Sequence, residues 1–499
     1  MIMKSRKISL FLILLWLIIA GLIVWFKVLP LGKVSYSLKY PIKQSLFGGK
    51  GFIGRLTPVE RVDVQDVSGA KVFADPVYFS IFTSRTFNEA KITLVYEDYL
   101  SSSTPVIEAG VLVDNIIWRY QLDSLENKKL ASFSDWDVIS DGDLTLFQRK
   151  KVFASLADFL TTLKNKPDSL CQNNLRGCLA FYNLKNTDAY LPSENFSGQE
   201  KRFKEINIPL QGAHQFYFIK PEGRNFNFSF DFTDLNLNKD ADQVEISIYR
   251  DSNKVYSQKI VDDFGAEESS LVRNFSTSFS WVSEDSDSYL YRLEIKINDD
   301  VVIKKIKEAP GALNAINRIR PLKTDSAPLI FYTDSNFIQT SVNDPANLQN
   351  IYFGQKSFSL PEPYKQFEFL NQENGVKAVR LEKGDIILET DGIFSFSPDS
   401  FFNYKFTSIN RHFVLDDNLQ FLFTTHKEPL ILKNGLKQAS VILNTKEAYR
   451  ERGRYSFILS VPGLSLSNDG YLIIKEIKVE FSGRTIFDKV KEFFGFYEN

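Results

Sequence analysis

A run of oxygen-bearing side chains extends from Asp234 to Glu245. Oxygen donors stand at positions 1, 3, 5, 7, 9 and 12 of this twelve-residue stretch, and they are Asp234, Asn236, Asn238, Asp240, Asp242 and Glu245. Ca²⁺ takes six to eight hard oxygen ligands, and EF-hand loops use this register. Position 6 is Lys239, where such loops have glycine, and the flanking residues alternate as strands do. A solvated polar hairpin has the same spacing, so both a calcium site and a hairpin stay open.

Residues for nucleophilic or acid–base catalysis are scarce. The sequence contains no Gly-x-Ser-x-Gly elbow and no His-Glu-x-x-His pair. The only histidines are His214, His412 and His426, and we interpret them as surface or strand-end residues rather than as catalytic bases. Paired carboxylates for glycoside hydrolysis depend on a spatial separation that a sequence does not reveal. We therefore predict no catalytic residue and favour a non-catalytic protein.

Cys171 and Cys178 are the two cysteines of the chain, in the segment CQNNLRGC. Two nearby cysteines favour a short-loop disulfide where the segment is extracytoplasmic, as the apolar run 8–26 predicts. A metal site is the alternative, but zinc usually takes four ligands, and no histidine has a useful spacing to this pair. We predict a structural disulfide.

Residues 8–26 form an unbroken apolar run, and residues 1–7 before it contain three basic side chains. Nineteen helical residues span roughly 28 Å, close to the hydrocarbon thickness of a bilayer. A cleaved signal peptide is the alternative, but its apolar core is about 7–15 residues long and ends at small residues. We predict an uncleaved transmembrane signal anchor in the plasma membrane, with the N-terminus cytoplasmic and the rest extracytoplasmic.

Composition indicates the class of the whole chain. Its 60 Lys and Arg nearly balance its 61 Asp and Glu, so nothing in the net charge of −1 favours nucleic acid as a partner. Aromatic residues make up 14% of the chain, with 44 Phe and 21 Tyr. Because these residues suit pleated, half-buried surfaces, the bias favours sheet.

Hydrophobic periodicity divides the part after the anchor into segments. Residues 27–70 are rich in Gly and Pro and are predicted as a stalk. Ser155 to Asp158 has a capping-box spacing that predicts a helix to about Lys164. Phe226, Phe228, Phe230 and Phe232 alternate with polar residues, which predicts a strand with one buried face. The predicted segments are a β-rich domain with the short helix and the disulfide loop (71–202), a β-sandwich (203–307), a linker (308–328), a second sandwich (329–484) and an amphipathic helix (485–499).

Two parts of the sequence resemble known sandwich families in their order of strands. HQFYFIKPEGRNFNFSFDFTDLN followed by QVEISIYRDSNKVY resembles jelly-roll accessory domains of the pre-peptidase C-terminal and carbohydrate-binding kinds. RYSFILSVPGLSLSNDGYLIIKEIKVEF is similar to the closing strands of galactose-binding-like jelly rolls. The resemblance implies antiparallel jelly-roll-like sandwiches and binding of glycans or cell-surface components, but a fold alone does not determine a function.

The sequence thus predicts a mainly β chain with one N-terminal transmembrane helix and about three antiparallel sandwiches. We expect a cell-surface binding or structural protein with a glycan or an envelope protein as its ligand, and with the bilayer as the partner of residues 8–26. The alternative is an anchored envelope hydrolase or accessory subunit with a carboxylate or calcium site. No cofactor is expected, apart from calcium at the stretch from Asp234 to Glu245.

Overall fold

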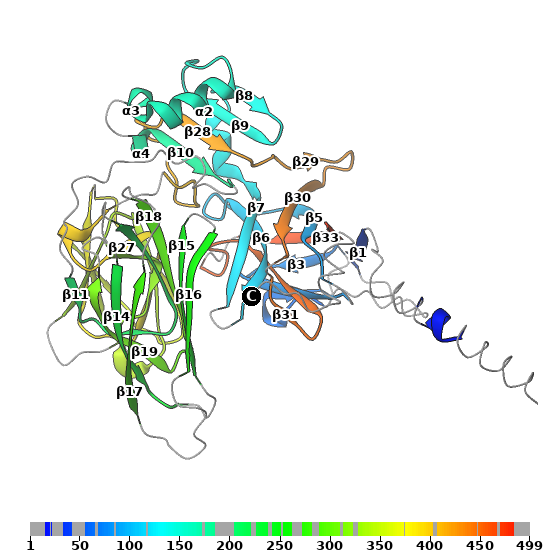
Figure 1. Ribbon diagram of the computed structural model, residues 1–499. Helices are drawn as coiled ribbons and strands as arrows, with labels where there is room; N and C mark the ends of the chain where they lie inside the picture. Colours follow the sequence, from blue (N-terminus) through cyan, green and yellow to red (C-terminus); the bar gives the residue numbers. More distant parts are fainter. Residues whose placement is uncertain are drawn as a thin grey trace, which may run out of the picture. The chain divides into compact units, whose positions relative to one another are not determined.

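The computed structural model shows a chain that divides into two compact units. Unit 1 combines Met1–Lys128 with Lys427–Asn499, and unit 2 comprises Lys129–His426. The architecture is mainly β, with several antiparallel sheets, as the sequence predicts (Figure 1). The structure describes residues 15–19, 21, 33–41, 55–64, 68–83, 86–115, 118–171, 175–184, 204–220, 226–237, 242–250, 253–261, 272–281, 289–309, 313–322, 328–373, 375–402, 407–446, 448–466 and 470–483.

Unit 1 consists of two antiparallel sheets. The first has the order β2-β3-β33-β5-β30-β29, with β1 beside β33, and the second has the order β31-β32-β6-β7, with β4 beside β32. The first sheet contains β1 (Val34–Lys39), β2 (Val62–Asp63), β3 (Ala70–Val72), β5 (Glu89–Asp98), β29 (Leu430–Ile431), β30 (Lys437–Asn444) and β33 (Leu472–Ser482). The second contains β4 (Val77–Phe82), β6 (Val106–Asp114), β7 (Arg119–Asn127), β31 (Arg450–Glu451) and β32 (Arg454–Ser460), and η1 (Val59–Arg61) precedes β2.

The core of unit 1 forms from alternate residues of both sheets. Ile92, Leu94 and Tyr96 of β5 are buried together with Phe457 of β32 and Val479 of β33. Because side chains of a strand alternate between its faces, each strand contributes every second residue to this core. Unit 1 is therefore built as a β-sandwich from strands at both ends of the sequence.

Unit 2 contains a second, larger sandwich. Its five-stranded sheet has the order β11-β19-β14-β17, with β12 beside β19, and its twelve-stranded sheet has the order β16-β15-β18-β13-β20-β27-β21-β26-β23-β24, with β22 beside β25 and β27. The first contains β11 (Lys204–Ile206), β12 (Leu210–Gln211), β14 (Phe226–Asp234), β17 (Arg273–Trp281) and β19 (Val301–Ala309). The second contains β13 (His214–Lys220), β15 (Gln243–Arg250), β16 (Asn253–Val261), β18 (Tyr289–Lys296), β20 (Leu313–Ile319), β21 (Leu329–Thr333), β22 (Phe337–Val342), β23 (Asn350–Phe353), β24 (Lys356–Ser359), β25 (Gln366–Leu370), β26 (Lys377–Leu381) and β27 (Ile386–Ser395); the 3₁₀ turns η4 (Pro345–Asn347) and η5 (Pro398–Ser400) follow β22 and β27.

Alternating phenylalanines line the core of this sandwich. Phe228, Phe230 and Phe232 of β14 are fully buried, as predicted, and they pack with Phe216 and Phe218 of β13 in the facing sheet. Burial of one such side chain contributes about 1.5–3 kcal/mol. Phenylalanine side chains therefore fill much of the space between the two sheets.

Unit 2 also contains a four-stranded sheet with a helical cover. The sheet has the order β10-β28-β9-β8, and only its β10–β28 pair is parallel: β8 (Asp137–Asp141), β9 (Leu144–Gln148), β10 (Leu179–Tyr182) and β28 (Phe421–Thr424). The helical elements are η2 (Lys128–Phe133), α2 (Leu156–Asn165), α3 (Pro167–Leu170) and α4 (Leu175–Cys178). Helix α2 begins as predicted, because the Ser155 Oγ accepts a hydrogen bond from the Asp158 N–H at 3.2 Å.

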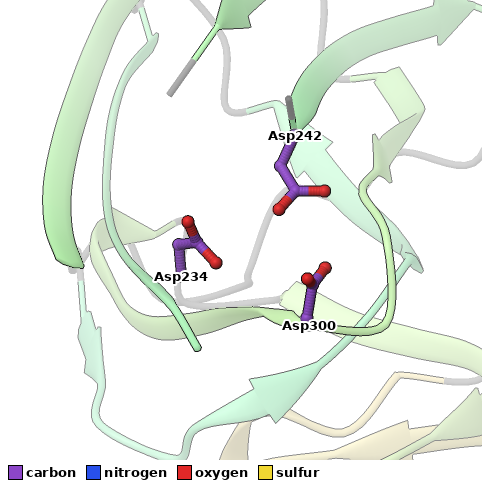
Figure 2. Close-up of side chains that lie close together, drawn as sticks. All are labelled: Asp234, Asp242 and Asp300. Carbon is purple, nitrogen blue, oxygen red and sulfur yellow. The ribbon is translucent and has the colours of Figure 1, made fainter. Parts of the chain in front are cut away.

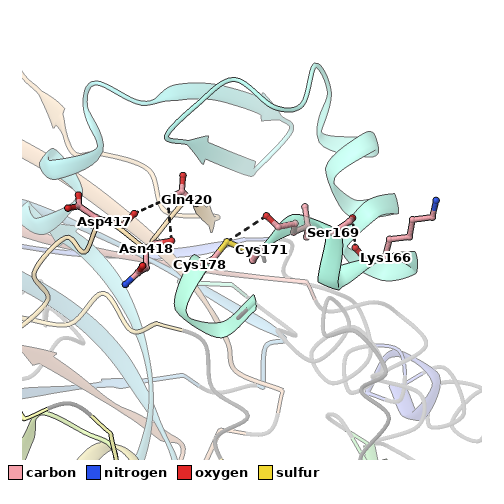
Figure 3. The surroundings of a disulfide bond; sticks show 8 residues. Lys166, Ser169, Cys171, Cys178, Asp417, Asn418 and Gln420 are labelled. Atoms are coloured by element: carbon pink, nitrogen blue, oxygen red, sulfur yellow. Dashed lines mark hydrogen bonds between the residues drawn. A yellow bond between two sulfur atoms is a disulfide. The ribbon is translucent and has the colours of Figure 1, made fainter. Parts of the chain in front are cut away.

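Cys171 and Cys178 form a disulfide next to this sheet (Figure 3). Their Cα atoms lie 5.9 Å apart, and both side chains are buried with Phe159 and Leu163 of α2. The Gln420 N–H donates to the Cys178 carbonyl at 2.8 Å, which joins the loop to the start of β28. The predicted disulfide is confirmed, and its surroundings indicate a structural role.

The structure describes the predicted N-terminal segments only in part and does not describe the predicted C-terminal helix. Within the predicted anchor 8–26, Leu15–Ile19 and Gly21 are described, and they are helical. Across the described part of the chain, the longest apolar helix is too short to cross a membrane. The predicted helix 485–499 lies outside the described residues. Part of the predicted stalk 27–70 is folded, since β1 and β2 belong to the first sheet of unit 1.

Strand pairing crosses the segment boundaries that we predicted. β20 lies within the predicted linker 308–328, yet it joins β13 to β27 inside the twelve-stranded sheet. β33, at the end of the predicted second sandwich, pairs with β5 of unit 1. Periodicity identifies a strand but not its partner, so these long-range pairings were not predictable from the pattern.

Candidate calcium site

Three aspartates meet where the chain passes between the two sheets of the unit 2 sandwich (Figure 2). Asp234 is the last residue of β14 in the five-stranded sheet. Asp242 directly precedes β15 in the twelve-stranded sheet, and Asp300 directly precedes β19, which returns to the five-stranded sheet. We call these residues the aspartate cluster. It therefore lies at two crossings between the same pair of sheets.

Local hydrogen bonds hold the two crossings in register. The Asn236 N–H donates to the Asp234 Oδ1 at 2.7 Å, in the turn that asparagine and aspartate often form after a strand. Asn236 has a φ of 49°, a left-handed conformation that asparagine tolerates better than most residues. The Leu235 N–H donates to the Asp300 carbonyl at 2.9 Å, which connects one crossing to the other.

The geometry of the aspartate cluster suits a calcium ion. One carboxylate oxygen from each residue lies within 4.8 Å of those from the other two. Ca²⁺ binds oxygen at about 2.3–2.6 Å, so two ligands on opposite sides of one ion stand about 5 Å apart. The oxygens are thus close enough to share an ion. Main-chain carbonyls and water commonly complete the six to eight ligands of such a site.

The aspartate cluster is also almost completely buried. Asp234, Asp242 and Asp300 are 0%, 1% and 3% exposed. Among the described residues, no hydrogen-bond donor reaches the buried Asp234 Oδ2. A buried carboxylate oxygen without a donor is costly, because it loses its hydration without compensation. A bound cation would supply the missing interaction.

The neighbouring carboxyl groups affect the pKa of Asp242. Burial, followed by the nearby charges of Asp300 and Asp234, raises the pKa of Asp242 to about 6, although the Asn298 side chain opposes this by donating to Asp242 Oδ1 at 2.5 Å. A carboxyl group holds its proton more tightly when it is desolvated and close to like charges. A divalent cation reverses this preference by stabilising the ionised form.

The structure brings together two of the six residues that the sequence predicts as ligands. Asp234 and Asp242 belong to the aspartate cluster, whereas Asn238 and Asp240 lie outside the described residues. Asn236 contributes its main-chain N–H to the turn.

Glu245 departs from the predicted ligand set. Its carboxylate lies 3.2 Å from the Lys254 Nζ and 3.9 Å from the Lys259 Nζ, on the lysine-bearing face of the β15–β16 pair. The physical reason is strand geometry. An EF-hand loop curls around its ion, whereas Glu245 follows strand alternation along β15 and sits between the core residues Val244 and Ile246.

Asp300 is the residue that sequence reasoning missed. It lies 66 positions after Asp234 in the sequence, and its segment Asn298-Asp299-Asp300 has the composition of an ordinary turn. No local spacing connects it to the stretch from Asp234 to Glu245. One signal in the sequence could have indicated the connection. Asp234 and Asp300 each follow a stretch of alternating apolar residues, which is typical of strands that end at the edge of a sandwich.

Among the described residues, the aspartate cluster contains no histidine. His214 is buried, its Nδ1 lies 2.8 Å from the Gly212 carbonyl, and the Arg320 N–H donates to its Nε2 at 3.2 Å. Burial is the main cause that lowers the pKa of His214 to about 4, so the ring is neutral. Both of its nitrogens contact main-chain groups. His426 is buried too. Neither histidine is a surface residue, but His214 is the first residue of β13, as the strand-end alternative predicts.

Neither a protein-family model nor a curated protein sequence matches the chain. Among solved structures, one match is the VP2 subviral particle of infectious bursal disease virus, with 9% identity, a TM-score of 0.15, and coverage of 92% of this chain and 82% of that chain. Another is dimeric latent PorU from Porphyromonas gingivalis, with 12% identity, a TM-score of 0.13, and coverage of 62% and 32%. At these TM-scores neither likeness supports an argument about fold or function.

Proposed function

We propose that this chain is a membrane-anchored, extracytoplasmic protein that binds or assembles with other surface components, and that Ca²⁺ completes the sandwich of unit 2. The observation that carries the proposal is the aspartate cluster, with its buried Asp234 Oδ2 that lacks a donor among the described residues. Extracellular calcium modules commonly bind at roughly 10⁻⁴–10⁻³ M, concentrations that occur outside the cytosol.

The position of the aspartate cluster supports a structural rather than a catalytic role for the ion. Its three carboxylates are at most 3% exposed, so a substrate of any size lacks access to them. An ion held by Asp234, Asp242 and Asp300 would join the end of β14 to the starts of β15 and β19, and hence one sheet to the other. This favours a binding or structural protein over a calcium-assisted hydrolase.

The anchored, extracytoplasmic address has separate support. The apolar run 8–26 has the length of a membrane span and follows basic residues, as in a signal anchor with its N-terminus in the cytoplasm. The Cys171–Cys178 disulfide fits an oxidising compartment, since cytosolic thiols are usually kept reduced.

Thermal unfolding with and without calcium tests the metal part of the proposal. With about 10 mM CaCl₂ after EDTA treatment, a site of 10⁻⁴–10⁻³ M affinity should raise the Tm of unit 2 by about 3–10 °C. Asp234→Asn and Asp300→Asn should remove the increase, because each substitution keeps the side-chain shape but removes a charge. The matched control is Asp137→Asn, an exposed residue of β8 in the same unit. An unchanged Tm in the native protein would contradict the calcium site.

Extraction and protease protection test the address. Carbonate washing of membrane vesicles should leave the full-length protein in the pellet. Protease added outside intact cells should digest the region after residue 27, whereas an antibody epitope placed before residue 8 should survive. Release by carbonate, or protection of the large C-terminal region, would contradict the anchored orientation without affecting the calcium result.

A further inference from the structure

Unit 2 contains a cleft of about 750 Å³ that is separate from the aspartate cluster. Its walls come from the turn before β22, from Asp391 and Gly392 in β27, and from the segment 407–419 that precedes β28. Small-molecule sites typically have volumes of about 300–1,000 Å³. The cleft, which we call the Asp391 cleft, is therefore large enough for a small ligand.

Side chains fix the position of Asp391 in the cleft. The Ser335 Oγ donates to Asp391 Oδ1 at 2.6 Å, and the Asn410 side-chain amide donates to Asp391 Oδ2 at 2.5 Å. Ser335 also accepts a hydrogen bond from the Phe337 N–H at 3.2 Å. The same residue thus holds a carboxylate acceptor and the main chain of the neighbouring Phe337. Such pre-organisation reduces the entropic cost of binding.

An uncharged aromatic wall stands next to this carboxylate. The ring centres of Phe337 and His412 lie 4.8 Å apart, and the His412 Nε2 lies 2.8 Å from the Glu368 Oε1. Burial, followed by the adjacent Arg411 charge, lowers the pKa of His412 to about 4. Glu368 also pairs with Arg411. With a pKa of about 4, His412 is neutral at physiological pH and presents a flat, uncharged ring.

The polar groups of the cleft determine the class of ligand that it fits. Its described lining has no lysine or arginine, and it contains the carboxylates Asp334, Asp391 and Asp416. These carboxylates repel anionic ligands. Side-chain amides, which donate as well as accept hydrogen bonds, also line the cleft. They belong to Asn336, Gln372 and Asn410. A simple cation needs only acceptors, whereas a polyhydroxylated molecule uses both.

We propose that the Asp391 cleft binds a neutral saccharide. Sugar hydroxyls would pair with the carboxylates and amides, and the C–H face of a pyranose ring would pack on the Phe337 side of the wall. The proposal rests on the proposed function and names the ligand class of that extracytoplasmic binding protein.

Calorimetric titration of the full chain tests this assignment, in a detergent without a sugar headgroup. The probes are maltotriose, cellotriose, mannotriose and triacetylchitotriose, with trigalacturonate as the anionic comparison. At least one neutral probe should bind, and Asp391→Asn or Phe337→Ala should weaken it by about tenfold or more, as expected for loss of a charged hydrogen bond or of an aromatic contact. Asp399→Asn, an exposed residue of η5 outside the cleft, should leave binding unchanged.

Three outcomes would overturn the assignment: no binding of any neutral probe at 10 mM, tighter binding of trigalacturonate, or unchanged affinity in both cleft variants. The Tm of each variant shows whether it is folded, and Phe337→Ala provides the test if Asp391→Asn is not. Calcium response and carbonate extraction are measured on the same preparation. If these are normal while saccharide binding is absent, the cleft assignment fails and the proposed function stands.

Discussion

The pKa of Asp242 is raised to about 6, above the ordinary 3.8 of an aspartate. A proton on this carboxyl group would compete with a bound cation. The folded protein then holds this proton more tightly than the unfolded chain does. Its contribution to stability is present at pH values below about 4 and is lost as the pH rises towards 6. In the absence of metal, neutral pH is therefore unfavourable for the aspartate cluster.

Asp242→Asn should remove this penalty. In EDTA we expect the Tm of the variant to exceed that of the native protein by roughly 2–4 °C at pH 7, the shift that about 1 kcal/mol causes in a unit of this size. The difference should vanish near pH 4, where Asp242 is protonated. In calcium at pH 7 the order should reverse. Thermal unfolding from pH 4 to 7 measures this, and a pH-independent difference would show that the charge of Asp242 is not the cause.

Asp98 of unit 1 should show the opposite pH dependence. Burial raises its pKa, but hydrogen bonds from Lys128 and Lys437, at 2.8 Å and 3.0 Å, outweigh it and lower the pKa below 3.8. The stability that Asp98 contributes is thus present above about pH 4 and is lost as the pH falls through the lowered pKa. Asp98→Asn should cost about 1.5–3 kcal/mol at pH 7. Urea unfolding at pH 7 and pH 3 measures this, and an equal cost at both would contradict it.

At the residue scale, the sequence predicted part of the candidate site. Asp234 and Asp242 were predictable because a polar run interrupts two alternating strands. Asp300 was not, since only the crossing of the chain between two sheets brings it to them. Glu245 was predicted as a ligand from its spacing in an EF-hand loop. It lies on strand β15 instead, where the spacing of such a loop does not hold.

At the level of elements, the sandwich of unit 2 depends on the phenylalanine row of β14. Phe230→Ala should destabilise unit 2 by about 3–5 kcal/mol, because Phe230 is fully buried and its removal leaves a cavity. Val255→Ala in β16 should cost less than about 0.5 kcal/mol, because Val255 is 41% exposed. Urea unfolding measures both. Similar costs for the two variants would show that the β14 row is not a tightly packed core.

Elements were the most predictable feature of this chain. The row 226–232 and the helix that begins after Ser155 follow from local periodicity and capping, and the structure has both. The predicted stalk was mistaken in part, because β1 is short and becomes stable only through pairing with β33, about 440 residues later. Local composition contains no information about such a partner.

For the whole molecule, the two-part origin of unit 1 is the feature with the largest consequence for stability. A chain that stops at residue 426 would lack β29 to β33, and β5 would lose both of its neighbours, β30 and β33. We expect this truncated chain to lose the cooperative unfolding transition of unit 1 and to keep the unfolding transition of unit 2. Calorimetry and limited proteolysis measure the outcome. Two intact transitions would show that residues 1–128 fold without the C-terminal strands.

β5 becomes fully paired only after nearly all of the chain has been synthesised. Its sequence neighbour β4 belongs to the other sheet, while β30 and β33 begin at residues 437 and 472. At about 5–20 residues per second, a ribosome takes roughly 20–70 s to proceed from residue 128 to 472. Throughout that interval both edges of a ten-residue, half-apolar strand are open to pairing with other chains. Until β30 and β33 have been synthesised, we therefore expect self-association through these open edges to compete with the folding of unit 1.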